Sequence, residues 1–252
     1  MTGCTRPEAT LHRARLEIPI KLDADLMLTV ALYPVDAARP HAAVLVSPPG
    51  VGRDTWDILA ARAQQAGLAC AVIELPPPGE PRGRPSGDGK DSAGETTSTR
   101  PAAAIDEARR LLVERGANPH DIALIGAGSA ANVALTYAVS RPEIPAVVLL
   151  SPGLVEDGGN AEAAIAAYGN RASLIMTSEN DGYAAASARA IKKAAPGFCE
   201  LREYAGAAHG VDVLHASEQA VEQVLVWLAE VLNFRYPESE PPPHTISGSI
   251  SP

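Results

Sequence analysis

Apolar residues recur along the chain in short runs, which are separated by helical patterns and by turns rich in glycine and proline. The first two runs follow each other closely, which predicts an antiparallel strand pair, and the later runs alternate with helical patterns. This order predicts an α/β fold, a mostly parallel sheet of about eight strands with helices on both faces. The expected strands are 14–20, 26–35, 42–47, 69–75, 122–126, 145–151, 172–178 and 198–204.

The helical segments carry apolar residues three and four positions apart, so that one face of each helix is apolar. The first helix follows the third strand, and we expect Asp54 to cap it and Gly67 to end it. The stretch 76–101 is rich in proline, glycine and serine and has no apolar period, which predicts a long exposed loop. The later helices are expected at 102–115, after the fifth strand to about residue 140, at 161–168, at 183–195 and at 221–232.

The chain has 252 residues, of which 46% are hydrophobic, and its composition shows no internal break. This favours one domain, 14–234, between a flexible start at 1–13 and a disordered tail at 235–252. The net charge is −9, and lysine and arginine do not cluster with aromatic residues. A nucleic-acid partner is therefore not expected, whereas a small-molecule ligand or substrate is compatible with the sequence. The oligomeric state is not readable from the sequence.

The three cysteines, Cys4, Cys70 and Cys199, lie far apart and show no metal-ligand spacing. They predict neither a disulfide framework nor a zinc site, and Cys70 and Cys199 are expected to be small core residues within strands. No metal or cofactor is expected.

No apolar run is long enough to span a membrane and no signal peptide is recognisable, so a cytoplasmic location is the default. The alternative to a cytoplasmic location is an exported lipoprotein. In that case residues 2–4, Thr-Gly-Cys, would end a signal whose true start lies upstream, and Cys4 would carry the lipid anchor.

The stretch IALIGAGSAANVAL, residues 122–135, joins an apolar strand to a helix through a cluster of small residues. It contains Gly126-x-Gly128-x-x-Ala131, a pattern that can cradle the phosphates of a dinucleotide. Two expected features of such a site are missing. The next strand ends in Ser151 and not in an acidic residue for the ribose, and the motif lies in the fifth strand, after a β-rich opening. The dinucleotide interpretation is therefore weak.

Several local motifs follow the expected strands in a recognisable order. SPPGVGRDTW runs from Ser47 to Trp56 after the third strand, and ELPPPG ends the fourth. The small-residue turn follows the fifth strand, SEND ends at Asp181 after the seventh, and GAAHG contains His209 after the eighth. In element order and in these motifs, residues 15–232 resemble the α/β-hydrolase superfamily, particularly small bacterial lidless members of the dienelactone hydrolase and esterase type.

This resemblance implies acyl transfer at the carboxyl edge of the sheet. In that chemistry a serine attacks a carbonyl carbon, a histidine takes the serine's proton, an acid orients the histidine, and backbone N–H groups stabilise the oxyanion. The resemblance assigns the acid to Asp181 and the base to His209, in the family's order of nucleophile, acid and histidine.

The nucleophile turn and the oxyanion loop depart from the family's pattern. Aligned without gaps, Gly128 occupies the nucleophile position, and Ser129 falls one residue later, where serine is favoured as a helix N-terminal residue. One family oxyanion donor comes from the loop after the third strand, where Pro48 and Pro49 have no N–H. Gly50 would supply a donor only if that loop is rearranged, and the second donor would come from Ser129.

Three functional hypotheses follow. The first is an α/β-hydrolase-like protein that lacks serine-dependent catalysis, because Gly128 stands at the nucleophile position, and that binds a small acyl or ester-like ligand or a protein partner. The second is an active serine hydrolase of esters, thioesters or amides that uses Ser129, His209 and Asp181, which requires the turn to shift by one residue. The third is a dinucleotide-binding protein.

Overall fold

The computed structural model describes residues 15–77, 99–156, 159–217 and 219–235. Within these ranges eight strands form one sheet in the order β1-β2-β4-β3-β5-β6-β9-β10. Strand β2 pairs antiparallel with β1 and β4, and the other strand pairs of this sheet are parallel. The predicted fold class, including the antiparallel opening pair, is confirmed. The strands are β1 (Leu16–Lys21), β2 (Met27–Tyr33), β3 (His41–Ser47), β4 (Leu68–Glu74), β5 (Ile122–Ala127), β6 (Ala146–Leu150), β9 (Ala172–Ser178) and β10 (Cys199–Tyr204).

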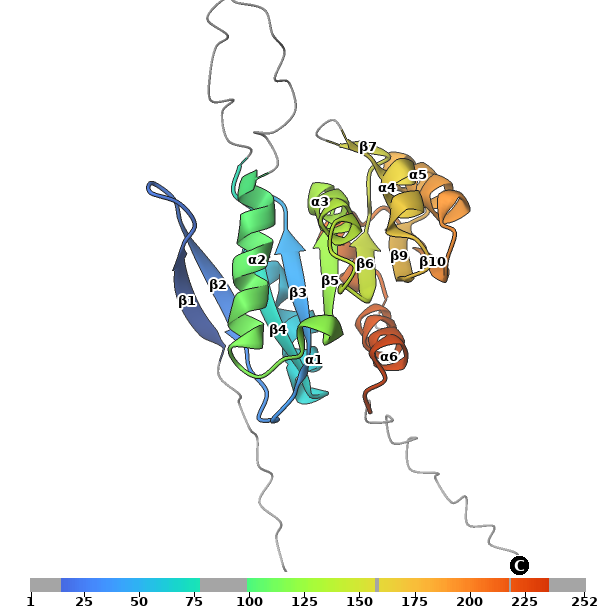
Figure 1. Cartoon of the computed structure of the whole chain (residues 1–252). Helices are drawn as coiled ribbons and strands as arrows, with labels where there is room; N and C mark the ends of the chain where they lie inside the picture. The colour runs from blue at the N-terminus through green and yellow to red at the C-terminus, as the bar shows by residue number, and fades with distance from the viewer. Residues whose placement is uncertain (1–14, 78–98, 157–158, 218, 236–252) are drawn as a thin grey trace, which may run out of the picture.

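Helices cover both faces of this sheet (Figure 1). Side chains of α2, α3, α4 and α5 pack on one face, and those of α1 and α6 pack on the other. Short 3-10 turns connect several elements, and a two-residue hairpin of β7 (Val155–Glu156) and β8 (Gly159–Asn160) precedes α4. The helices are α1 (Asp57–Gln65), α2 (Thr99–Val113), α3 (Ser129–Val139), α4 (Ala161–Tyr168), α5 (Gly182–Ala194) and α6 (Ala220–Leu232), with 3-10 turns η1 (Arg53–Trp56), η2 (Pro119–Asp121) and η3 (Gly210–His215).

Two helix starts differ from the predictions. Asp54 does not cap the first helix, because it lies inside η1 and its carboxylate pairs with Arg15 at 2.5 Å. Helix α2 begins at Thr99, inside the predicted loop 76–101. Pro101 does not prevent this, because an N–H in the first helical turn has no intrahelical acceptor.

Gly67 follows α1 with a φ of +89°, as expected of a helix-ending glycine.

Several predictions lie outside the described residues. They concern Cys4, the start 1–13, nearly all of 76–101 and nearly all of the tail 235–252.

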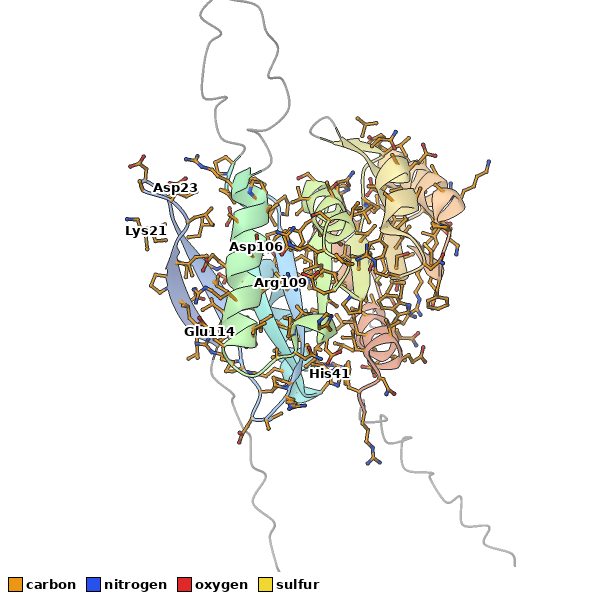
Figure 2. The ribbon with its side chains drawn as sticks, viewed as in Figure 1. Lys21, Asp23, His41, Asp106, Arg109 and Glu114 are labelled. Carbon is orange, nitrogen blue, oxygen red and sulfur yellow. The ribbon has the colours of Figure 1, made fainter. Side chains whose placement is uncertain are left out.

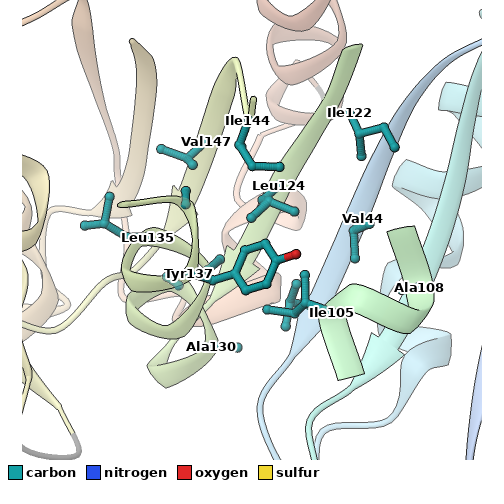
Figure 3. Packing of buried hydrophobic residues seen from close by; sticks show 14 of the residues in the cluster. Val44, Ile105, Ala108, Ile122, Leu124, Ala130, Leu135, Tyr137, Ile144 and Val147 are labelled. Carbon is teal, nitrogen blue, oxygen red and sulfur yellow. The ribbon is translucent and has the colours of Figure 1, made fainter. Parts of the chain in front are cut away.

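The strands are apolar on both sides because each face of the sheet is covered by helices. On one face Leu124 and Val147 of the sheet pack against Ile105 of α2 and Tyr137 of α3 (Figure 3). On the other face the fully buried Trp56 lies in a separate cluster with residues of α1 and α6. Burying an aliphatic or aromatic side chain of this size contributes about 1.5–3 kcal/mol. These two layers hold the strand ends, and the loops that leave them, in fixed positions.

The two internal cysteines are part of this core. Cys70 in β4 and Cys199 in β10 are both buried, and burial raises the pKa of each thiol. Both thiols therefore stay protonated and behave as small apolar groups. In the part of the chain that the structure describes, no group of three or more His, Cys, Asp and Glu side chains is placed to hold a metal ion. No described helix combines the length and the apolarity needed to cross a bilayer.

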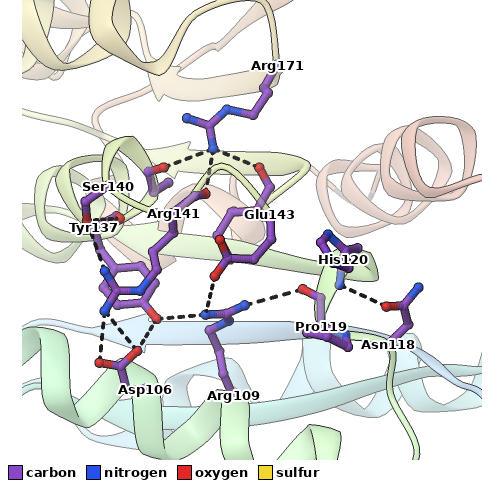
Figure 4. Close-up of polar contacts among 12 residues, drawn as sticks. Asp106, Arg109, Asn118, Pro119, His120, Tyr137, Ser140, Arg141, Glu143 and Arg171 are labelled. Carbon is purple, nitrogen blue, oxygen red and sulfur yellow. Dashed lines mark hydrogen bonds and ion pairs between the residues drawn. The ribbon is translucent and has the colours of Figure 1, made fainter.

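A polar network joins α2 to α3 at the rim of one apolar layer. Asp106 and Arg109 project from α2 (Figure 2, Figure 4). Arg109 donates to the hydroxyl of Tyr137 at 3.0 Å, to Glu143 at 3.2 Å and to the carbonyl of Pro119 at 3.3 Å. The Tyr137 hydroxyl in turn donates to Asp106 at 2.6 Å. Because Arg109 is buried, its charge depends on these partners.

We expect Arg109→Ala to lower the free energy of unfolding by about 2–4 kcal/mol, because it leaves Glu143 and Tyr137 without their buried partner. The neighbouring Arg110, which pairs with Glu107 and Glu114 on the exposed side of α2, serves as the matched control. Arg110→Ala is expected to change stability very little. Urea denaturation of both variants measures the difference, and equal losses would contradict the assigned role of Arg109.

Candidate functional site

The loops that carry the candidate residues meet at one edge of the sheet. Strands β5, β9 and β10 run parallel, so their carboxyl ends, and the loops that follow, lie side by side. The loops after β9 and β10 are joined by backbone hydrogen bonds from Glu179 to Tyr204 at 2.8 Å and from Asn180 to Gly206 at 2.9 Å. These bonds place the next residue, Asp181, beside the loop of His209.

Asp181 and His209 form a direct hydrogen bond. The ring Nδ1 lies 2.7 Å from the Asp181 carboxylate. A carboxylate accepts hydrogen bonds, so this bond places a proton on Nδ1 and leaves Nε2 of the neutral ring as an acceptor. The Asp181 side chain is 16% exposed and the His209 side chain is 60% exposed. The pair therefore presents an oriented imidazole to solvent.

Gly128 lies directly in front of this imidazole. Its backbone has a φ of +54° and a ψ of −130°, and its N–H donates to the carbonyl of Leu150 at 2.9 Å. A Cβ added to Gly128 would stand 3.5 Å from Nε2 of His209, and no other atom beyond its chain neighbours lies within 4 Å of it. Gly210, with a φ of +59°, packs against the same turn. Position 128 is thus where a side chain would face the histidine.

Ser129 has a different environment. It is the first residue of α3 and is half-buried. Within the described residues its hydroxyl has no hydrogen-bond partner, so no bond joins it to His209. Its N–H lies at the first position of the helix, where the backbone has no intrahelical acceptor. The structure thus brings together Gly128, Asp181 and His209, and no hydrogen bond joins the Ser129 hydroxyl to them.

The loop after β3 offers few donors to a ligand. Pro48 and Pro49 have no N–H. The N–H of Gly50 donates at 2.8 Å to the carboxylate of Glu74. Glu74 ends β4 and is the register partner of Ser47, the last residue of β3, which explains the contact. The sequence analysis missed Glu74, although an acidic residue at the end of a buried strand was a signal for it.

The Gly126-x-Gly128-x-x-Ala131 pattern is explained by packing. A Cβ on Gly126 would lie 2.5 Å from the carbonyl oxygen of Ala130 and 2.7 Å from the Cα of Ala131. Gly126 therefore allows α3 to cross close to β5. The N–H of Gly128, which a phosphate would need, already donates to Leu150. These contacts account for the motif without a dinucleotide.

Ser151 adds strain next to this turn. It follows β6 with a φ of +47°, its side chain is buried, and its hydroxyl has no partner among the described residues. Register places it beside Gly128, because Ala127 pairs with Leu150. A non-glycine residue in this conformation costs about 1–3 kcal/mol, and such residues cluster at functional sites. Nothing in the sequence indicates this strain.

The eight-stranded sheet, its strand order and the helices on both faces are those of the α/β-hydrolase fold. Solved structures with this fold match most of the chain. A dienelactone hydrolase from Anabaena variabilis ATCC 29413 is 17% identical with a TM-score of 0.61, covering 88% of this chain and 98% of its own. An esterase from Pyrobaculum calidifontis is 16% identical with a TM-score of 0.61, covering 87% and 85%. Carboxyl esterase 2 from Tuber melanosporum is 12% identical with a TM-score of 0.65, covering 89% of each chain.

No protein-family model matches the sequence, and no curated protein matches it either. At these identities the structural matches establish the fold, and the resemblance to dienelactone hydrolases and esterases is confirmed at that level.

Gly126 and Gly128 are expected to differ in how much substitution by alanine destabilises the protein. Gly126→Ala should destabilise the protein by about 3 kcal/mol or more, because the added methyl group meets backbone that does not move aside. Gly128→Ala should cost less, about 1–3 kcal/mol, because only its positive φ is unfavourable. Thermal unfolding of both variants tests this order, and a reversed order would contradict the described packing of the turn.

Proposed function

We propose that this protein is an α/β-hydrolase-fold protein that does not use a serine nucleophile and that binds a small acyl or ester-like ligand at the His209–Asp181 pair. The observation that carries the proposal is the glycine at position 128. A side chain at that position would point at Nε2 from 3.5 Å, and glycine has none. Serine acyl transfer requires a hydroxyl within hydrogen-bond reach of its base.

The oxyanion side supports the same conclusion. Acyl transfer needs N–H donors aimed at the developing oxyanion, and losing one typically costs about 10²–10³-fold in rate. Pro48 and Pro49 supply no donor, and the donor of Gly50 is occupied by Glu74. The acylation machinery is thus weakened at two separate places, the nucleophile and the oxyanion loop.

Ligand binding is supported by exposed side chains on the segments that follow β6 and β9. Tyr183 lies two residues after Asp181 and is 56% exposed. Its hydroxyl donates to the carbonyl of Val155 at 3.2 Å and accepts from the N–H of Val155 at 3.1 Å. Val155 is also 56% exposed. These exposed side chains would offer apolar contact to a ligand that also carries a hydrogen-bonding group.

A serine-directed fluorophosphonate tests whether the protein acylates. The wild-type protein is expected to remain unlabelled. Gly128→Ser is expected to be labelled, because its new hydroxyl would lie beside Nε2, and the double variant Gly128→Ser with His209→Ala is expected to lose the label. Mass spectrometry identifies the modified residue. Wild-type labelling that disappears in Ser129→Ala would overturn the proposal and establish the serine hydrolase alternative.

A further inference from the structure

We infer that the His209–Asp181 pair acts on water directly, as a general base that hydrolyses small activated esters without an acyl-enzyme intermediate. The inference rests on the proposed function, because it requires that no serine side chain stands between the base and the ligand. It assigns an activity to a pair that otherwise only binds.

The orientation of the imidazole suits a base. The 2.7 Å bond from Nδ1 to Asp181 fixes the ring and leaves Nε2 as the acceptor. Among the described residues Nε2 has no hydrogen-bond partner. The side chain is 60% exposed, so solvent reaches it. A general base must lie within hydrogen-bond distance of the proton that it takes, and a solvent molecule at Nε2 meets that condition.

The glycine makes room for that water. Around a Cβ at position 128, the nearest atom beyond its chain neighbours is Nε2 at 3.5 Å, and nothing else lies within 4 Å. A serine there would fill the space with its CH₂–OH group. With Gly128 no side chain covers this side of Nε2, so a water molecule can approach it and its oxygen can act in place of a nucleophilic hydroxyl. A methyl group on residue 128 would occupy the same space without offering a proton.

The reaction balances without any further reagent. An O–H bond of water breaks as its proton passes to Nε2, and the water oxygen forms a bond to the ester carbonyl carbon. The tetrahedral intermediate then collapses, and the bond from carbon to the leaving oxygen breaks. The products are a carboxylic acid and an alcohol or phenol, and Nε2 returns its proton to the leaving oxygen or to solvent.

The expected rate sets the substrate class. A positioned general base contributes about 10²–10⁴-fold, whereas a missing oxyanion donor forfeits about 10²–10³-fold. The base acts without that oxyanion contribution, so only esters with a good leaving group are expected to react measurably. A phenolate leaving group also departs without needing a proton.

Hydrolysis of p-nitrophenyl acetate tests the inference in the full-length protein. We expect His209→Ala to lower the second-order rate constant about 10²-fold. His120→Ala removes another exposed histidine, remote in sequence from the pair, and is expected to leave the rate unchanged. A rate that is equal in wild type and His209→Ala would overturn the inference.

Gly128→Ala separates this mechanism from unspecific catalysis by an exposed imidazole. It keeps His209 and Asp181 but fills the place of the water, so we expect at least a tenfold loss. If Gly128→Ala does not fold, as judged by circular dichroism, Asp181→Asn provides a second variant and should also lower the rate, because the imidazole loses its anionic partner. A rate unchanged in the folded variants would overturn the inference.

A solvent deuterium isotope effect and the presence or absence of a product burst distinguish the water mechanism from direct attack of the imidazole on the ester. A water mechanism moves a proton in the transition state, so a solvent deuterium isotope effect is expected, with no burst of nitrophenolate. A burst without an isotope effect would overturn it. Absent fluorophosphonate labelling together with no His209-dependent hydrolysis would refute the inference alone, whereas labelling at Ser129 would refute the proposed function.

Discussion

The 2.7 Å hydrogen bond between Asp181 and His209 is the interaction on which the rest of the site depends. Helix α5 and strand β10 separate the two residues along the chain, and they meet because β9 and β10 are parallel neighbours whose loops are joined by backbone hydrogen bonds. The bond orients a half-exposed imidazole toward the turn at Gly128. The parallel pairing of β9 with β10 and the bonds between their loops therefore hold this contact.

The turn at Gly128 keeps the backbone that a nucleophile would need while it lacks the side chain. Its N–H is bonded to Leu150, Gly210 packs against it, and its φ is positive. The neighbouring Ser151 also has a positive φ, so strain is concentrated at this edge of the sheet. The turn therefore places a residue without a side chain opposite Nε2 of His209.

The fold class was predictable because strands and helices alternate with clear apolar periods, and those periods reflect burial on both faces of the sheet. Asp181 and His209 were assigned as acid and base through the family resemblance, and in the structure they meet because the loops after parallel strands share one edge of the sheet. The contact of Glu74 with Gly50 and the strain at Ser151 depend on atomic positions across strands, which local patterns do not encode. The predicted cap at Asp54 was wrong because a tertiary ion pair with Arg15 outweighed the local preference.

The central claim is that His209 faces a glycine and not a serine hydroxyl. A high-resolution crystal structure of the ligand-free protein tests it through the distance from Ser129 Oγ to His209 Nε2. We expect this distance to exceed hydrogen-bond reach, with Gly128 lying opposite Nε2. A Ser129 Oγ about 2.6–3.2 Å from Nε2 would contradict it and would assign the protein to the serine hydrolases.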